Sequence, residues 1–149
     1  METGDILIVD ADSDDREMIA DIAIDLHLPN KCRFFSDGDA LVAHLSQAGE
    51  APFIILSEVR LPKINGFELR DRLLKSSDKR LRSVPFIFWS VTTSEAEIER
   101  AYELSAHGFF VKPASLLEME IVFKTLLQYW RTSRMPAKKE EISNRGTIV

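Results

Sequence analysis

The sequence lacks several features that mark common classes of protein. Its one cysteine, Cys32, excludes an internal disulfide framework and a cysteine-rich zinc module, and is typical of a protein in the reducing cytoplasm. No apolar run approaches the roughly 18 residues that a membrane-spanning helix needs. The opening residues METGD lack the basic start of a signal peptide. We therefore expect a cytoplasmic protein that does not bind a membrane.

An excess of positive charge is also missing. The 149 residues include 24 acidic and 19 basic side chains, which gives a net charge of −5. This balance argues against electrostatic binding of a nucleic acid by the whole chain. The chain has neither the phosphate loop G-x-x-x-x-G-K-[ST] nor the nucleophile elbow G-x-S-x-G. We therefore do not expect an enzyme, although a hydrolase or phosphotransferase on a similar sheet is an alternative without positive support.

What is present is a regular alternation of strand and helix patterns. Short apolar runs predict five buried strands, at residues 6–9, 32–35, 53–56, 85–89 and 109–111. A helical pattern follows each of them, and Ser94 and Ser115 each open a capping-box motif. Residues 76–83 are polar and basic, which predicts a surface loop. This order is typical of an α/β fold, a doubly wound five-stranded parallel sheet with helices on both faces.

Polar residues stand at the ends of four predicted strands. Asp10 follows the first strand, Glu58 the third, Ser90 the fourth and Lys112 the fifth. In a doubly wound sheet the site lies beyond the carboxyl ends of the strands, so these side chains should converge. Carboxylates there favour Mg²⁺ or a lysine partner. A hydroxyl and an ammonium suit a phosphoryl group.

Four segments carry a resemblance to a known family: ILIVDAD, LSEVRLPKINGFEL, PFIFWS and AHGFFVKPAS. With them the chain resembles the receiver domain of response regulators in two-component signalling, over residues 4–131. The resemblance implies a (βα)5 flavodoxin-like receiver fold, phosphorylated by a kinase on an aspartate after the third strand. It also implies Mg²⁺ as cofactor, which two acidic residues after the first strand help to bind. We expect residues 132–149 to form a flexible tail.

The resemblance assigns roles to individual residues. Lys112 matches the family lysine, Ser90 the switch hydroxyl and Phe109 the switch aromatic residue. Pro113 would follow a cis peptide bond. The phosphoacceptor position, four residues before the loop proline, falls on Glu58 and not on an aspartate.

The predicted cation site also departs from the family pattern. The acidic pair falls on Asp10 and Ala11, so its second carboxylate is missing. The remaining candidate ligands are Asp10, Glu58 and the backbone carbonyl of Arg60. Because Mg²⁺ tolerates poor geometry badly, we expect weak binding or none. The Arg60 side chain is expected either to lie in solvent or to replace the cation.

Two roles remain open for Glu58. Its carboxylate either mimics a phosphoryl group, with a hydrogen bond from Ser90 and a pair with Lys112, or marks a dead site with a structural ion pair.

The leading hypothesis is a stand-alone, atypical receiver that signals through a protein partner without normal aspartate phosphorylation. That partner is a histidine kinase or a downstream effector, at the face formed by the fourth helix, fifth strand and fifth helix, and a homodimer stays open. The alternative is a functional phosphoacceptor receiver that uses Glu58 or another acid, such as Asp10.

Overall fold

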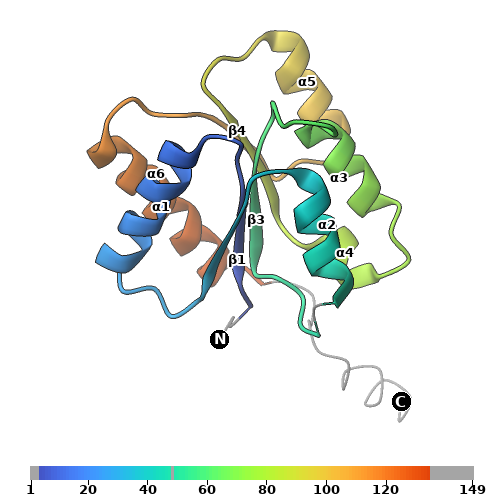
Figure 1. The fold of residues 1–149 in the computed structure, drawn as a ribbon, viewed down its shortest axis with the longest axis horizontal. Coiled ribbons are helices and arrows are strands. Elements are labelled where there is room, and N and C mark those ends of the chain that lie inside the picture. The colour runs from blue at the N-terminus through green and yellow to red at the C-terminus, as the bar shows by residue number, and fades with distance from the viewer. Residues whose placement is uncertain (1–3, 48, 135–149) are drawn as a thin grey trace.

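The protein is described here by a computed structural model, which defines residues 4–47 and 49–134 (Figure 1). The strands are β1 (Ile6–Val9), β2 (Cys32–Phe35), β3 (Ile54–Glu58), β4 (Phe86–Ser90) and β5 (Gly108–Val111). The helices are α1 (Ser13–Asp25), α2 (Gly38–Gln47), α3 (Gly66–Leu74), α4 (Lys79–Ser83), α5 (Glu95–Glu103) and α6 (Leu116–Thr132).

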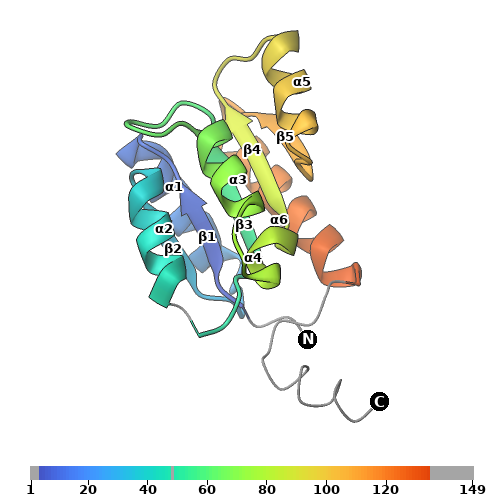
Figure 2. The ribbon, with the colours of Figure 1, turned by 90° about the vertical axis from the view of Figure 1, so that its right-hand side faces the viewer.

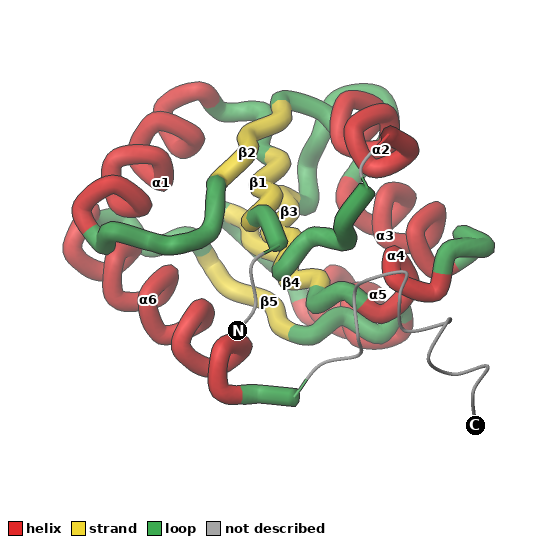
Figure 3. The backbone as a smooth tube through the Cα atoms, turned by 90° about the horizontal axis from the view of Figure 1, so that it is seen from below, coloured by secondary structure: helices red, strands yellow, loops and turns green. Residues whose placement is uncertain are grey.

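The five strands form one parallel sheet in the order β2-β1-β3-β4-β5 (Figure 2). Helices α1 and α6 cover one face of the sheet, and α2, α3, α4 and α5 lie on the other (Figures 1 and 3). The predicted doubly wound α/β fold is therefore confirmed. The parallel register brings the carboxyl ends of the strands to one edge of the sheet.

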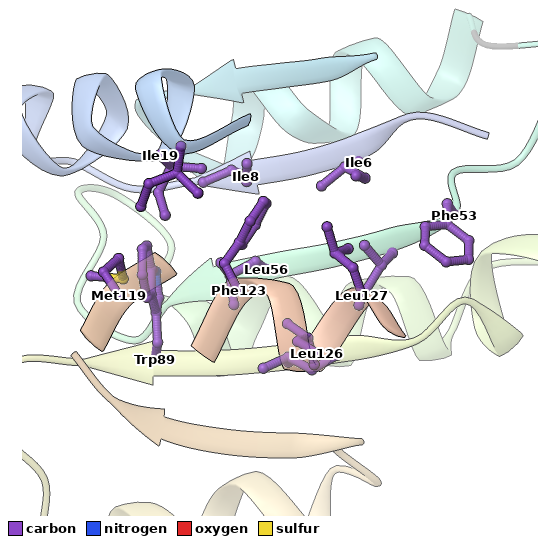
Figure 4. Packing of buried hydrophobic residues seen from close by; sticks show 13 residues of the cluster. Ile6, Ile8, Ile19, Phe53, Leu56, Trp89, Met119, Phe123, Leu126 and Leu127 are labelled. Atoms are coloured by element: carbon purple, nitrogen blue, oxygen red, sulfur yellow. The ribbon is translucent and has the colours of Figure 1, made fainter. Parts of the chain in front are cut away.

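The sheet is buried on both faces because its strands are apolar throughout. In β1, Ile6 and Ile8 point to one face while Leu7 and Val9 point to the other, as the alternation along a strand requires. On the first face, residues of α1 and α6 such as Ile19 pack on the sheet (Figure 4). The second face has its own cluster: Leu7, Val9, Leu41, Leu45, Ile55, Val59, Leu61, Leu69, Leu73, Val84, Phe86, Phe88 and Ala101.

The predicted surface loop at residues 76–83 is wrong in its second half, which forms helix α4. Asp78 begins this helix, because its carboxylate accepts a hydrogen bond from the backbone N–H of Arg80 at 2.9 Å. The Arg80 guanidinium returns to the same carboxylate at 3.0 Å, which lowers the pKa of Asp78. A five-residue helix with three basic residues has no apolar stripe that sequence periodicity could detect.

Both predicted capping boxes form only in half. Ser94 accepts from the N–H of Glu97 at 3.2 Å, and Ser115 accepts from the N–H of Glu118 at 3.1 Å. The Glu118 carboxylate, however, accepts a hydrogen bond from the Ser115 hydroxyl, and the Glu97 carboxylate pairs with Arg60. Neither glutamate therefore reaches back to the backbone N–H of its cap.

Two further expectations concern the chain near the end of the domain. The described residues contain no cis peptide bond, so the expected cis bond before Pro113 is wrong. The preference of an Xaa-Pro bond for trans is small, about 0.5–1 kcal/mol, so the residue pair alone does not fix the isomer. Helix α6 ends at Thr132, and most of the predicted tail, residues 135–149, lies outside the described residues.

No helix in the described part is long and apolar enough to cross a membrane.

Candidate functional site

Three carboxylates and one ammonium meet at the carboxyl ends of β1, β3 and β5. The Lys112 Nζ lies 2.8 Å from Asp10 Oδ2, 2.7 Å from Asp15 Oδ2 and 2.9 Å from Glu58 Oε2. The Lys112 side chain is 4% exposed and that of Asp10 is fully buried. The structure thus brings together Asp10, Glu58 and Lys112, which sequence reasoning placed at strand ends.

Asp15 is the member of this cluster that sequence reasoning missed. It lies in the first turn of α1, and its carboxylate accepts a hydrogen bond from Lys112. The available signal was the acidic run after β1, in which several carboxylates stand close together. Asp15 faces the cluster because of its position on the first turn of α1. Asp12 does not, because its carboxylate accepts a hydrogen bond from the N–H of Asp14 at 2.8 Å and so caps the helix.

The charges in the cluster do not balance. Three carboxylates and one ammonium leave a net charge of −2 when all are ionised, from three negative and one positive. Burial raises the pKa values of Asp10 and Glu58 above their ordinary values, and the nearby Lys112 lowers them only in part. Burial alone would lower the pKa of Lys112, but its contacts with the three carboxylates raise it, so the ammonium stays charged.

Lys112 also makes a cation–π contact with an aromatic ring. Its Nζ lies 5.0 Å from the centre of the Trp89 ring, a distance at which the cation is attracted to the ring face. Trp89 is buried in β4, as expected of a core residue. This contact and the three carboxylates together fix where the ammonium lies.

Backbone contacts position the two carboxylates that come from strand ends. Asp10 Oδ1 accepts a hydrogen bond from the N–H of Asp12 at 2.9 Å. Glu58 is the last residue of β3, and its carbonyl oxygen would clash with a Cβ at Gly66. A glycine is therefore required where α3 begins, because a side chain there would displace the end of β3.

Helix α3 is further fixed by a closed capping box. The Asn65 side chain accepts from the N–H of Glu68 at 2.9 Å, and the Glu68 carboxylate accepts from the N–H of Asn65 at 2.8 Å. The loop between Glu58 and this helix therefore has both ends anchored.

Ser90 and Arg60 form the other half of the site. Ser90 is buried at the end of β4, and its hydroxyl accepts a hydrogen bond from Arg60 Nη1 at 2.7 Å. Among the described residues no hydrogen bond joins Ser90 to Glu58. The Arg60 side chain is 55% exposed, as expected of a loop arginine in solvent, but it does not enter the carboxylate cluster, so the expectation that it replaces the cation is wrong. The side chain crosses instead to Ser90 and α5.

Phe109 lies half-buried in β5. Its ring centre is 6.2 Å from that of Phe88, and it packs against the core cluster beneath α2, α3 and α5. The ring is thus partly turned inward, while the hydroxyl of Ser90 is bound to Arg60.

The donor set around Lys112 does not fit a magnesium ion as it stands. Mg²⁺ requires close to six oxygen ligands in octahedral geometry. Ala11 is exposed and offers no side-chain oxygen, and the ammonium contacts all three carboxylates. Within the described residues, no group of three or more His, Cys, Asp or Glu side chains is arranged to hold a metal ion.

Comparison with known proteins decides the family. The model of the response regulator receiver domain matches residues 6–123. The chain belongs to this family. It is therefore a receiver domain of two-component signalling, a class of signalling module that interacts with proteins such as histidine kinases and effectors. The family binds Mg²⁺.

The receiver domain is similar to proteins of Methanothrix harundinacea and Synechocystis sp.. It is 28% identical over 92 residues to the probable methanogenesis regulatory protein FilR2 of Methanothrix harundinacea, covering 62% of this chain and 58% of that protein. It is 24% identical over 138 residues to the response regulator Rcp1 of Synechocystis sp., covering 89% of this chain and 92% of Rcp1.

Solved structures share the fold of the receiver domain. The phosphorylated cyanobacterial phytochrome response regulator RcpA has a TM-score of 0.79 at 25% identity, covering 91% of this chain and all of that one. The Mn²⁺-bound form of Rcp1 has a TM-score of 0.78 at 23% identity, covering 90% and 99%. The predicted flavodoxin-like receiver fold is confirmed.

Proposed function

We propose that this receiver domain is atypical and signals by binding a protein partner without normal phosphorylation of an aspartate. The observation that carries the proposal is the place of Glu58, at the end of β3 and 2.9 Å from Lys112. This is the position at which the family motif has its phosphoacceptor aspartate. Phosphoryl transfer depends on positioning, and a side chain longer by one methylene misplaces the attacking oxygen.

The cation site supports the same proposal. Asp10, Glu58 and the backbone carbonyl of Arg60 are the ligands that remain, and Ala11 supplies none. Lys112 competes with a metal ion for the same carboxylate oxygens. We propose that Mg²⁺ binds weakly here, so that the charge on a transferring phosphoryl group would be poorly neutralised.

The geometry favours a fixed ion pair over phosphoryl mimicry. A mimic of the phosphorylated state would hold Ser90 close to the Glu58 carboxylate, about 2.6–3.0 Å between oxygens. Instead the Ser90 hydroxyl is bound by Arg60, and Glu58 pairs with Lys112. We propose that Glu58 acts as a permanent partner of Lys112 and does not drive the Ser90 switch.

The proposed partner surface is the face formed by α5, β5 and α6, which contain the fourth predicted helix, the fifth strand and the fifth predicted helix. Large apolar side chains are exposed on it, among them Tyr102, Val111, Ile121 and Tyr129. A groove of about 550 Å³ runs between β5 and α6, with Trp130 in its wall. Exposed apolar area of this kind is typical of a protein interface. The partner is a histidine kinase, a downstream effector or a second copy of the chain.

A phosphorylation experiment tests the proposal. The wild-type protein is incubated with acetyl phosphate and Mg²⁺, and its intact mass is measured over time. We expect no added phosphoryl group in the wild type and little in Glu58→Asp or Ala11→Asp alone, because each variant repairs one of two coupled defects. The double variant should be labelled clearly, although Val91 beside Ser90 can limit the rate.

The alternative function gives a different result in the same experiment. If Glu58 or another acid such as Asp10 already accepts the phosphoryl group, the wild type is labelled at a rate like that of the double variant. Loss of that label in Glu58→Gln would identify Glu58 as the acceptor. Either result would replace the atypical receiver by a functional one.

A matched pair of variants tests the partner surface. Ile121→Asp places a charge on α6 within the proposed face, at a position that is 55% exposed. Ile24→Asp places the same charge on α1, at a position that is 72% exposed. Association with a candidate kinase or effector, and self-association in sedimentation, should be lost in the first variant and kept in the second. Equal loss in both would remove this face from the proposal.

A further inference from the structure

One guanidinium joins three segments beside the receiver site. Arg60, in the loop after β3, donates through Nη1 to Ser90 Oγ at 2.7 Å and to the Thr92 carbonyl at 3.2 Å. Its Nη2 donates to Glu97 Oε2 at 2.8 Å. The group therefore links the end of β4, the loop after β4 and the first turn of α5. Arginine suits this task because its planar guanidinium presents five donors in a fixed arrangement.

Glu97 depends on this contact. Its side chain is 22% exposed, and its Oε1 is buried without a hydrogen-bond partner in the described structure. The predicted capping box would have turned this carboxylate back to the N–H of Ser94, but it points to Arg60 instead. Without Arg60, a half-buried carboxylate at the start of α5 would be left with no cation.

Ser90 depends on the same group from the other side. It is buried, and its hydroxyl oxygen accepts from Arg60. In the receiver family this hydroxyl contacts the phosphoryl group, so its orientation sets the state of the loop. Here a side chain of the protein itself determines that orientation.

We propose that Arg60 is a positioning residue that holds Ser90, the β4–α5 loop and the first turn of α5 in one arrangement without a phosphoryl group. Because α5 supplies part of the proposed partner surface, Arg60 keeps that part in place at all times. This inference rests on the proposed function only for the role of the surface. The contact network itself is independent of that role.

Amide hydrogen exchange of the isolated protein tests the proposal, with neither phosphodonor nor partner present. In Arg60→Ala we expect exchange of the amides of residues 97–100 to rise about tenfold, because a charge-assisted network is lost while the core is kept. Amides of β1 and β3 should exchange at the wild-type rate. Arg60→Lys should not restore protection, since a single ammonium cannot bridge both Ser90 and Glu97.

Two further variants make the test specific. Glu97→Gln keeps the shape of the side chain but removes its charge, and should raise exchange in the same residues. Arg72→Ala removes an exposed guanidinium that is 3.5 Å from Asp39 and should leave α5 unchanged. The effects of Arg60→Ala and Glu97→Gln should not add, because both break one network.

The outcomes separate this inference from the proposed function. Wild-type exchange at residues 97–100 in both Arg60→Ala and Glu97→Gln would overturn the role of Arg60 and leave the phosphorylation results untouched. If the amides of residues 97–100 were as protected in Arg60→Lys as in the wild type, a positive charge alone would be sufficient, and the bridging role of the guanidinium would be wrong. Phosphoryl labelling of the wild type would overturn the atypical receiver while leaving the exchange result standing.

Discussion

The protein buries two cationic side chains in opposite ways. Lys112 is surrounded by three carboxylates at the carboxyl ends of the strands. Arg70, on α3, is 1% exposed, and no carboxylate in residues 4–47 and 49–134 forms an ion pair with it. Its Nε donates to the carbonyl of Leu104 and its Nη2 to that of Ser105, both at 3.0 Å.

The two surroundings shift the pKa of the cation in opposite directions. Contacts with carboxylates raise the pKa of Lys112 against the effect of burial. Burial lowers the pKa of Arg70 to about 10, and the carbonyl groups it contacts do not restore it. These carbonyls belong to the end of α5, where the helix dipole favours a positive charge. Arg70 therefore stabilises a helix terminus, whereas Lys112 holds together groups that repel one another.

The largest effect should follow removal of Lys112. Lys112→Met keeps most of the volume of the side chain but leaves Asp10, Asp15 and Glu58 together without a cation. Removing one partner from a buried ion pair costs about 3–5 kcal/mol, which we expect as the loss in unfolding free energy at pH 8. Urea denaturation measures it.

The pH dependence of this loss identifies its cause. Without the ammonium, the folded-state pKa values of Asp10 and Glu58, which burial already raises, rise further above their unfolded values. Groups with a raised folded pKa favour the folded state at low pH and lose that contribution as the pH rises through the folded pKa. The deficit of Lys112→Met should therefore shrink at pH 5. An equal deficit at pH 5 and pH 8 would show that lost packing on Trp89, and not repulsion, is responsible.

Removal of Arg70 should cost less and depend less on pH. Arg70→Met leaves the carbonyls of Leu104 and Ser105 without donors, for a loss of about 2–3 kcal/mol. Most of that loss should persist from pH 8 to pH 5, because no carboxylate is released. The small exception is His107, whose pKa is lowered by burial and by Arg70. The control is Arg72→Met, at an exposed position of the same helix. If Arg70→Met recovered as much unfolding free energy between pH 8 and pH 5 as Lys112→Met does, the two cations would not differ in the way described.

The sequence was sufficient to predict the sheet, but it predicted only some of the residues that surround Lys112 and Arg70. Unbroken apolar runs such as residues 6–9 have few other uses than a buried strand, so β1 and β2 were predicted to the residue. The strand ends then placed Asp10, Glu58 and Lys112 on one edge of the sheet. Asp15 was missed because a run of acidic residues does not show which side chain turns inward.

The contacts of Arg70 and Arg60 could not be predicted from the sequence. Arg70 occupies an inner position of α3 between Leu69 and Leu73, which is a detectable but ambiguous signal. Arg60 lies in a loop whose path depends on Lys63, a residue with a φ of 68°. No periodicity describes such a loop, so the direction of the Arg60 side chain needed the structure.

Neutralising one carboxylate of the Lys112 cluster should stabilise the protein. Burial raises the pKa of Glu58, so its ionised form is unfavourable in the folded state near neutral pH. Glu58→Gln should increase the unfolding free energy by roughly 1 kcal/mol at pH 7. The gain should fall toward zero as the pH drops through the pKa of Glu58, where the wild type becomes protonated and recovers the same contribution.

The control for that variant is Glu99→Gln, which neutralises an exposed glutamate on α5. It should change stability little at any pH. A Glu58→Gln protein that is less stable than the wild type would show that the Glu58–Lys112 pair is worth more than the repulsion it brings.

The smallest effect should be that of Mg²⁺ on the wild type. A ligand that binds only the folded state raises stability by RT ln(1 + [L]/Kd), which is about 0.4 kcal/mol when the ligand concentration equals Kd. With Ala11 in place of an acid and Lys112 on the remaining carboxylates, we expect less than this at 10 mM Mg²⁺. Ala11→Asp supplies a carboxylate and Lys112→Met removes the competing ammonium, so thermal unfolding should respond more strongly to Mg²⁺ in each. Ala11→Asn, which adds an uncharged oxygen, should respond less than Ala11→Asp. A wild-type response equal to that of Ala11→Asp would show that the three carboxylates accept a metal ion despite Lys112, and Lys112 would then not be the fixed partner that distinguishes it from Arg70.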